Sequence, residues 1–384
     1  MPSIIFFIFL FSFLLLHIYC CRRVWQALEI FPKARKPIIA LICLIGISYF
    51  SHIFLTQFFS FEVIRFIALI GSIWIILFLS FLLILAIIDL VRFLNKHFNF
   101  LPKFIFLNYT KTKFITMLTV TLSISFLCFF GLFNFMTPII TELEIPINKK
   151  INGQIVENPD EKKTLNIVAA SDFHLGYIIN KSRLKKFVDL INAQKPDIIL
   201  LVGDVVDMSL EPVLVQKMDE ELRQLKSKYG VYVVAGNHEH IRGNYENIMN
   251  YYRNCGFIVL EDSTVLINDE FYVVGRKDKS DKNRKKTTEL TANLDKSKPI
   301  ILLDHQPFNL EHSVESGVDL HLSGHTHNGQ FFPINLIVKQ IYELPYGYMK
   351  KGDTHFYVTS GLGLWGPPIR IGTKSELLKI KMMY

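Results

Sequence analysis

The sequence contains little cysteine, and the cysteines it has form no recognisable motif. Five are present among 384 residues, and four of them, Cys20, Cys21, Cys43 and Cys128, lie in or beside apolar segments. Cys255 stands alone in the polar part of the chain. Their spacing offers neither a disulfide framework nor a zinc-thiolate motif. Cysteine spacing therefore indicates neither the fold nor the function.

Acidic residues are scarce in the first 150 residues. That segment holds 13 Lys and Arg against five Asp and Glu, whereas residues 151–384 hold 29 of each. The whole net charge of +8 thus arises in the first segment, which is also the apolar one. We read this imbalance as a sign of membrane topology and predict no nucleic acid as a specific partner.

Four apolar segments predict membrane-spanning helices, because a span needs about 20 apolar residues. They cover residues 4–19, 38–59, 66–88 and 114–136. The first is short enough to be read as a signal peptide, but it lacks a basic start and a small-residue cleavage site, so an uncleaved helix is favoured. Ionisable side chains are few within the spans, which favours an anchor over a transport path. We expect a transmembrane anchor at 1–140 and a second domain at 141–384.

The basic residues predict how this anchor is oriented. Two loops, between the first and second and between the third and fourth segments, hold ten of them: Arg22, Arg23, Lys33, Arg35, Lys36, Arg92, Lys96, Lys103, Lys111 and Lys113. The intervening connection carries Glu62, and the exit from the fourth segment carries Glu142 and Glu144. The positive-inside rule then places both basic loops in the cytoplasm and the second domain outside.

From residue 164 onward, short apolar runs alternate with amphipathic segments. Strands are predicted at 165–170, 197–202, 231–235, 300–303 and 318–322, and helices at 181–194, 214–225 and 245–252. Such alternation is typical of an α/β domain. In open α/β sheets, ligands bind beyond the carboxyl ends of the strands. Polar residues that follow these strands should therefore converge in space.

Each predicted strand is followed by a polar cluster. The clusters read SDFHLG (171–176), GDVVD (203–207), GNHEH (236–240), DHQP (304–307) and SGHTHNGQ (323–330). Their candidate metal ligands are Asp172, His174, Asp204, Asn237, His305, His325 and His327. In an extended segment, residues two apart point the same way, so each DxH or HxH pair can direct two donors at one centre.

The number and type of these donors suggest two metal ions. Seven donors are too many for one zinc ion, whereas two ions that share a bridging carboxylate would use them all. Nitrogen and oxygen donors rich in imidazole suit Mn, Fe, Zn, Co or Ni. The identity of the metal is left open by the sequence.

The ordered motifs DxH, GDxxD, GNHE, H and GHxH resemble those of the calcineurin-like metallophosphoesterase superfamily. Near the C-terminus, SGLGLWGPPIRIG resembles its membrane-linked bacterial branch. The resemblance implies a sandwich of two mixed β-sheets flanked by helices. It places one ion on Asp172, His174, Asp204 and His327, and the other on Asp204, Asn237, His305 and His325. It also implies that His238 contacts the substrate phosphate and that Asp207 orients His238.

The expected function is hydrolysis of a phosphate ester, phosphodiester or pyrophosphate, by attack of a hydroxide that bridges two metal ions. The substrate would be a phosphorylated small molecule or a lipid-linked compound at a bacterial plasma membrane, with the catalytic domain on the outer side. The alternative is a non-catalytic binding or regulatory module on the same fold, which would normally have lost some of these ligands. Substrate identity and oligomeric state are left open.

Three further features have alternative interpretations. Asn328 replaces the first Gly of the common GHTHGGQ, and Asn tolerates a left-handed backbone well. The basic run at 276–298 is interpreted as a solvated loop or as a surface for anionic lipid headgroups. Arg370 would line the pocket or close the fold, and Asp304 would support the site from behind His305.

Overall fold

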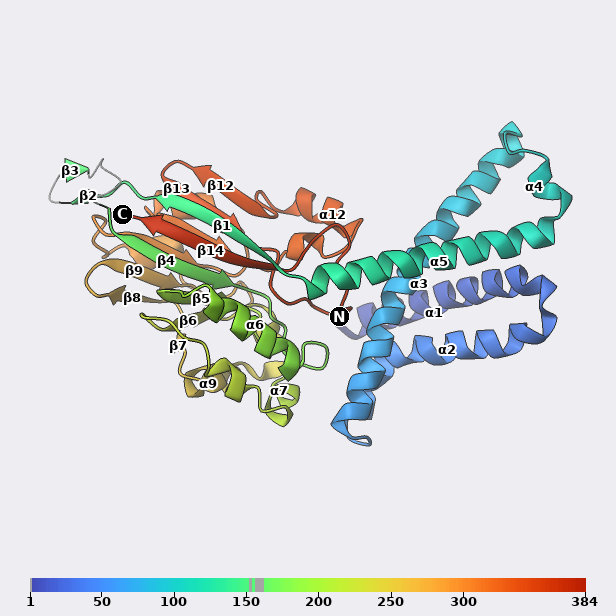
Figure 1. The fold of residues 1–384 in the computed structure, drawn as a ribbon, viewed down its shortest axis with the longest axis horizontal. Helices are drawn as coiled ribbons and strands as arrows, with labels where there is room; N and C mark the ends of the chain where they lie inside the picture. Colours follow the sequence, from blue (N-terminus) through green and yellow to red (C-terminus); the bar gives the residue numbers. More distant parts are fainter. Residues whose placement is uncertain (1, 152–153, 156–161) are drawn as a thin grey trace. The chain divides into compact units, whose positions relative to one another are not determined.

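The computed structural model describes residues 2–151, 154–155 and 162–384. The chain divides into a helical unit, Met1–Phe130, and a second unit, Gly131–Tyr384. Figure 1 shows both as a ribbon.

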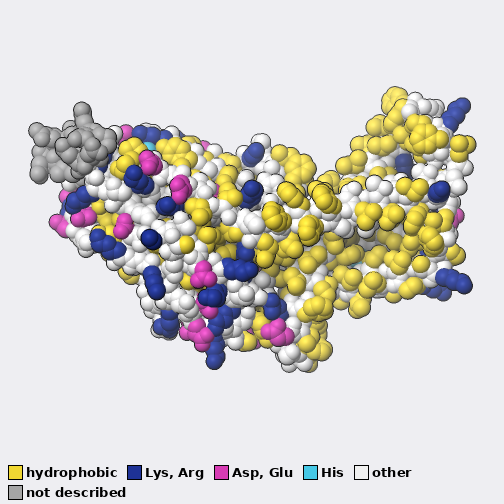
Figure 2. All heavy atoms as spheres, in the orientation of Figure 1, with side chains coloured by type: hydrophobic (Ala, Val, Ile, Leu, Met, Phe, Trp, Pro, Cys, Tyr) yellow, Lys and Arg dark blue, Asp and Glu magenta, His cyan; other side chains and the backbone are white. Residues whose placement is uncertain are grey.

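The helical unit consists of long apolar helices joined by short connections. Its elements are α1 (Pro2–Ala27), η1 (Leu28–Ile30), α2 (Pro32–Leu55), α3 (Phe61–Phe98), α4 (Phe104–Leu107) and α5 (Tyr109–Met136). Four of them, α1, α2, α3 and α5, are long and apolar enough to cross a membrane. Hydrophobic side chains dominate the surface of this unit in Figure 2. The protein is therefore a multi-pass membrane protein.

The helices extend beyond the apolar segments seen in the sequence. Helix α3 has 38 residues and includes Arg92 and Lys96, which lie beyond the apolar run at 66–88. Helix α1 continues to Ala27 and includes Arg22 and Arg23. Lys and Arg are good helix formers, so the backbone remains helical after hydrophobicity ends. Parts of both basic loops are thus helical.

The second unit contains two six-stranded mixed sheets, which confirms the expected fold class. The first sheet has the order β1-β14-β4-β5-β6-β7 and the second β12-β13-β11-β10-β9-β8. In the first sheet the strands are β1 (Ile139–Pro146), β14 (Glu376–Met383), β4 (Thr164–Ala170), β5 (Ile198–Val202), β6 (Val231–Val234) and β7 (Ile258–Val259). In the second they are β12 (Gly347–Lys351), β13 (Thr354–Val358), β11 (Leu320–Ser323), β10 (Ile300–Leu303), β9 (Phe271–Gly275) and β8 (Ser263–Ile267). A short pair, β2 (Lys150–Ile151) and β3 (Gln154–Ile155), lies apart from both.

The strands that precede the polar clusters are parallel neighbours. In the first sheet β4 pairs with β5 and β5 with β6, and in the second β10 pairs with β11, all in parallel. All five predicted strands are confirmed within a few residues at their ends. Because parallel neighbours end at the same edge, the loops that follow them lie together.

Alternation along these strands divides the core into layers. Ile167, Leu200 and Val234 belong to a cluster that also contains Ile301 and Leu320 of the second sheet, so the two sheets pack face to face. Residues of opposite parity on the same strands pack against α6 (Lys181–Ala193) and α9 (Tyr245–Asn254). The outer face of the second sheet packs against α10 (Thr287–Thr291). Two further helices, α11 (Glu311–Glu315) and α12 (Ile334–Ile341), follow later in the chain.

One predicted helix is broken in two. The segment at 214–225 forms parts of α7 (Glu211–Val215) and α8 (Asp219–Leu222), separated by Lys217 with a positive φ of 50°. Val213, Met218 and Leu222 are nevertheless fully buried in the same core cluster. The predicted apolar face is confirmed at Met218, Leu222 and Leu225, whereas Leu214, its first residue, is 53% exposed. The spacing also did not reveal the turn between the two short helices.

The end of α5 is part of the second unit. Asn134 donates a hydrogen bond to the backbone carbonyl of Arg370 over 3.1 Å, and Arg183 of α6 donates to the carbonyls of Phe135 and Met136. Strand β1 begins at Ile139, directly after α5 ends. The fourth membrane helix therefore continues into the sheet domain with almost no intervening chain.

Candidate metal centre

The predicted ligands come together at the carboxyl ends of the parallel strands. Three overlapping groups have ligand atoms within 4.8 Å of one another: Asp172 with His174 and His327, His174 with Asp204 and His238, and Asp204 with His305 and His325. Asn237 joins the last group, because its Oδ1 lies 2.7 Å from His325 Nδ1. All seven predicted ligands and His238 thus belong to one continuous cluster.

The backbone that presents these ligands differs from the expected extended conformation. Asp172 and His174 have φ values of 56° and 51°, and His325 and His327 have 70° and 49°. The extended geometry predicted for the two pairs is therefore wrong. In each pair both predicted ligands have left-handed φ, whereas the residue between them, Phe173 or Thr326, does not. Positive φ is uncommon for residues other than Gly, although Asn, Asp and His adopt it more often than most. Such backbone strain is characteristic of functional sites.

The loops after β4 and β5 run side by side. The backbone amides of Asp172 and His174 donate to the carbonyls of Gly203 and Asp204, each over 3.0 Å. Asp172 also accepts the backbone amide of His325 over 3.1 Å, which connects the first sheet's loop to that of β11 in the second sheet. The two sheets are therefore joined through the same carboxylate that is offered as a ligand.

Glycine is required where the loops cross beneath the cluster. Gly203 has a φ of 81°, and a Cβ at Gly236 would collide with the carboxylate of Asp204 and the ring of His305. Both positions therefore require glycine. The close approach at these glycines brings the ends of β5 and β6 against the imidazole supplied by β10.

His305 is oriented by the first sheet although it follows a strand of the second. Its Nδ1 lies 2.7 Å from the carbonyl of Val202, so Nδ1 carries the proton and donates. Its Nε2 faces Asp204 Oδ2 at 3.2 Å and forms no hydrogen bond with any described residue. A fixed tautomer with a free, buried nitrogen is the usual arrangement of a metal-ligating histidine.

His238 and Asp207 form a pair at the open side of the cluster. His238 Nδ1 lies 2.8 Å from Asp207 Oδ1, and the side chains are 13% and 28% exposed. The backbone amide of His238 also donates to Asp204 Oδ1 over 2.8 Å. Asp207 therefore holds the ring through Nδ1, Asp204 holds the backbone of His238, and the side chain remains partly exposed.

The carboxylates of Asp172 and Asp204 are buried as anions, and that of Asp207 beside them is partly exposed. Burial of Asp172, Asp204 and Asp207 would raise the pKa of each, but neighbouring imidazoles hold all three pKa values below the usual range. Three negative charges within one cluster need cations to balance them, since buried charge is stable only when it is paired. The site therefore demands positive charge.

Two of the histidines, His174 and His305, have raised pKa values because of these carboxylates. Burial alone would lower the pKa of His174, but the surrounding carboxylates, Asp172 and Asp207 foremost, raise it to about 10. The pKa of His305 is likewise raised well above its usual range by Asp204, against the effect of burial. Protons on these two rings and bound metal ions are alternative ways to neutralise the carboxylates.

The other two histidines are held neutral. Burial lowers the pKa values of His325 and His327 to about 4. The Nε2 atoms of His327 and His174 lie 3.2 Å apart, and His327 Nε2 lies 3.2 Å from Asp172 Oδ1. Neutral imidazoles and carboxylates that converge at such distances fit a divalent metal ion, since ligands must be deprotonated to bind it.

A fully buried carboxylate that the sequence reasoning passed over organises the loops. Glu239 accepts the backbone amides of Asp204, Val205, Val206 and Gly236, together with the hydroxyl of Tyr252 over 2.7 Å. It thereby fixes the turns after both β5 and β6. Its place in the GNHE motif, directly after His238, was the available signal.

Arg370 proves to be buried beneath the cluster. It is fully buried and donates to the carbonyls of Ser360, Gly361 and Gly363, and its Nη2 lies 3.5 Å from His327 Nδ1. Of the two alternatives raised above, Arg370 closes the fold. It provides hydrogen bonds to the carbonyls of the C-terminal loop that contacts Asp172.

The other sequence features lie at the edge of the site or outside it. Asp304 pairs with Arg276 over 2.9 Å and with Arg284 over 3.2 Å. Part of the basic run is thus internal, whereas Lys285 and Lys286 are exposed. Asn328 has a φ of 50°, which confirms the left-handed turn expected there.

Comparison with known proteins agrees with this site. The calcineurin-like phosphoesterase family matches residues 165–329. An uncharacterized metallophosphoesterase of Aquifex aeolicus is 33% identical over 215 residues, which cover 54% of this chain and 80% of that protein. One from Helicobacter pylori is 34% identical over 233 residues, which cover 58% of this chain and 60% of that protein.

Membrane proteins are also among the relatives. A Bos taurus transmembrane protein with metallophosphoesterase domain is 28% identical over 261 residues, which cover 63% of this chain and 56% of that protein. The chain thus spans less than two thirds of the length of the Helicobacter and Bos relatives, at 60% and 56%. The motifs, the two mixed sheets and the Aquifex relative together establish that this chain belongs to the calcineurin-like metallophosphoesterases.

Proposed function

We propose that this protein is a metal-dependent phosphoesterase that hydrolyses a phosphate ester, phosphodiester or pyrophosphate. The observation that carries the proposal is the convergence of seven nitrogen and oxygen donors beside the accessible His238–Asp207 pair. A binding module would not need a positioned acid–base group next to its ligands. The full donor set together with that pair therefore favours catalysis over the non-catalytic alternative.

The donors divide into two sets that share Asp204. One ion is assigned to Asp172, His174, Asp204 and His327, and the other to Asp204, Asn237, His305 and His325. Two of the three observed groups correspond to these sets. When bound, divalent ions lower the pKa of water and neutralise charge that develops on a phosphoryl group.

His238 is assigned to the substrate. With Asp207 accepting from its Nδ1, the ring presents Nε2 to the open side of the cluster. From there Nε2–H donates to a phosphate oxygen or protonates the leaving oxygen. Asp207 acts by orienting the imidazole.

We place the substrate at the membrane surface. The end of α5 packs into the second unit, and β1 follows it directly, so the domain begins where the fourth span ends. A phosphate on a lipid or a membrane-attached molecule suits such an enzyme better than a freely diffusing one. The exposed Lys285 and Lys286 would assist by attracting anionic headgroups.

We place the metal centre on the outer side of a bacterial plasma membrane. Four spans with basic residues between the first and second and between the third and fourth support this orientation. With four spans and both basic loops in the cytoplasm, Met1 and Tyr384 would both lie on the outer side.

The first prediction concerns the shared carboxylate. Asp204→Asn should abolish phosphoesterase activity and lower the metal content together, because an amide cannot bridge two cations as a carboxylate does. Asp189→Asn, at an exposed position of α6, is the matched control and should change neither. The measurement is elemental analysis of folded protein alongside activity restored by Mn, Co or Zn after chelation. At most one ion per wild-type chain would refute the two-metal assignment.

The second prediction separates chemistry from metal binding. His238→Ala should retain both metals and lower turnover by roughly 100-fold or more, the scale expected for a positioned acid–base group. His240→Ala is the control, because His240 stacks on Tyr245 at 4.4 Å and belongs to none of the donor groups. Unchanged turnover in the His238 variant would remove that residue from the mechanism.

A third prediction addresses the surface substrate. Hydrolysis of a lipid phosphate in anionic vesicles should exceed that of its short-chain soluble analogue. Changing Lys285 and Lys286 to Ser should slow only the vesicle reaction, by up to about fivefold for each charge, since a basic residue near an anionic surface contributes about 1 kcal/mol. Changing the exposed Lys226 and Lys228 to Ser tests the effect of lost charge alone. Equal rates on both substrates would contradict the surface assignment.

The fourth prediction concerns orientation. Alkaline phosphatase fused after Tyr384 should be active in bacterial cells, and a fluorescent protein that folds only in the cytoplasm should stay dark at the same position. The opposite pair of results would place the metal centre in the cytoplasm.

A further inference from the structure

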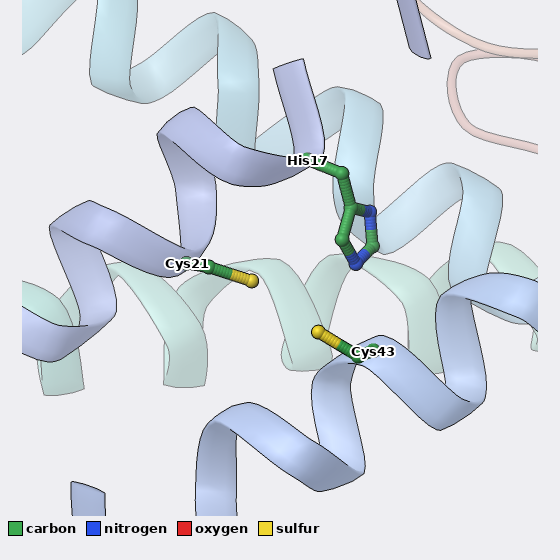
Figure 3. A group of neighbouring side chains, drawn as sticks. All are labelled: His17, Cys21 and Cys43. Carbon is green, nitrogen blue, oxygen red and sulfur yellow. The ribbon is translucent and has the colours of Figure 1, made fainter. Parts of the chain in front are cut away.

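A second group of metal-ligating side chains lies within the helical unit. His17 and Cys21 of α1 and Cys43 of α2 have ligand atoms that all lie within 4.8 Å of one another. Residues four apart share one face of a helix, so His17 and Cys21 approach α2 together. Figure 3 shows the two sulfur atoms directed toward each other, with the imidazole beside them.

The imidazole of His17 is buried without a polar partner. Its residue is 8% exposed, and neither ring nitrogen forms a hydrogen bond with any described residue. The rings of Phe13, Trp74 and Phe78 lie around it, with centroids 5.5, 5.7 and 5.2 Å from the centroid of the imidazole. A buried polar group without a hydrogen-bond partner destabilises the folded state. A metal ion that binds the nitrogen carrying the lone pair would give that nitrogen a partner.

Glycine makes room for this ring. A Cβ at Gly46 of α2 would overlap the His17 imidazole. The close packing holds the ring against α2, on which Cys43 lies three residues before Gly46. The position of His17 is therefore defined by packing as well as by its place on α1.

We propose that His17, Cys21 and Cys43 bind a soft, thiophilic metal ion, with Zn²⁺ as the species best matched in charge. Thiolate sulfur and imidazole nitrogen are the donors that Zn²⁺ prefers. Binding releases one proton from each thiol, and Zn²⁺ with two thiolates and a neutral imidazole carries no net charge. Neutrality matters among apolar helices, where an uncompensated charge is costly. The ion would link α1 to α2.

This site differs chemically from the phosphoesterase centre. The donors of that centre are nitrogen and oxygen atoms, and no cysteine belongs to its groups among the described residues. A spectroscopic signal that requires sulfur ligands therefore reports on the helical site alone. Failure of one assignment would leave the other unaffected.

The test uses the full chain, purified in detergent under reducing conditions and stripped of metal with a chelator. Co²⁺ bound by thiolates absorbs in the near ultraviolet through sulfur-to-metal charge transfer, and Co²⁺ on nitrogen and oxygen ligands does not. The wild type should show this band for one Co²⁺ per chain, and Zn²⁺ should displace it. Cys21→Ser, Cys43→Ser and His17→Gln should each weaken binding at least about 10-fold, the loss caused by removing even an outer partner of a ligand.

Two cysteines outside the group provide matched controls. Cys20→Ser and Cys128→Ser remove buried thiols of the same unit and should leave the band unchanged. Absence of the band in the wild type, or a band that survives all three ligand changes, would overturn the proposal. A disulfide between Cys21 and Cys43 in protein purified without reductant, with no Co²⁺ band after reduction, would overturn it as well.

Discussion

Buried negative charge at the ends of β4 and β5 is the constraint on which the second unit depends. Asp172 and Asp204 are held as anions in the interior and Asp207 as a partly exposed anion beside them, and each needs a cation or a hydrogen-bond donor within reach. Imidazoles from both sheets and backbone amides from the loops meet this need. The face-to-face packing of the sheets brings those partners to one edge, so the core and the site are parts of the same arrangement.

The loops around the carboxylates are shaped at the expense of ordinary backbone geometry. Five of the seven predicted ligands, Asp172, His174, Asp204, His325 and His327, adopt positive φ. Gly203 and Gly236 leave no space for a side chain. Glu239 compensates by collecting four backbone amides that would otherwise be buried and unpaired. Arg370 does the same for three carbonyls. Glu239 and Arg370, both buried, thus stabilise the strained turns that carry the predicted ligands.

The helical unit follows a different physical rule. Its outer surface is apolar, and large hydrophobic side chains lie on it: Phe126 is 69% exposed and Phe129 71%. Such a surface is stable in lipid and not in water. Polar groups inside it are few, and His17 with its two neighbouring thiols stands out because hydrocarbon cannot satisfy the ring nitrogens.

The sequence by itself determined the spans and the strands and predicted which side chains would cluster at the strand ends, because these depend on local hydrophobicity and on short motifs. It predicted the correct side chains at Asp172 and His174 with the wrong backbone, since left-handed turns arise from loop-to-loop hydrogen bonds. Only the tertiary structure decided that Glu239 holds two turns, that residues 214–225 contain a break, and that Cys43 meets Cys21. The physical reason is distance along the chain: contacts between residues far apart in sequence depend on how elements pack, and local patterns carry no information on that.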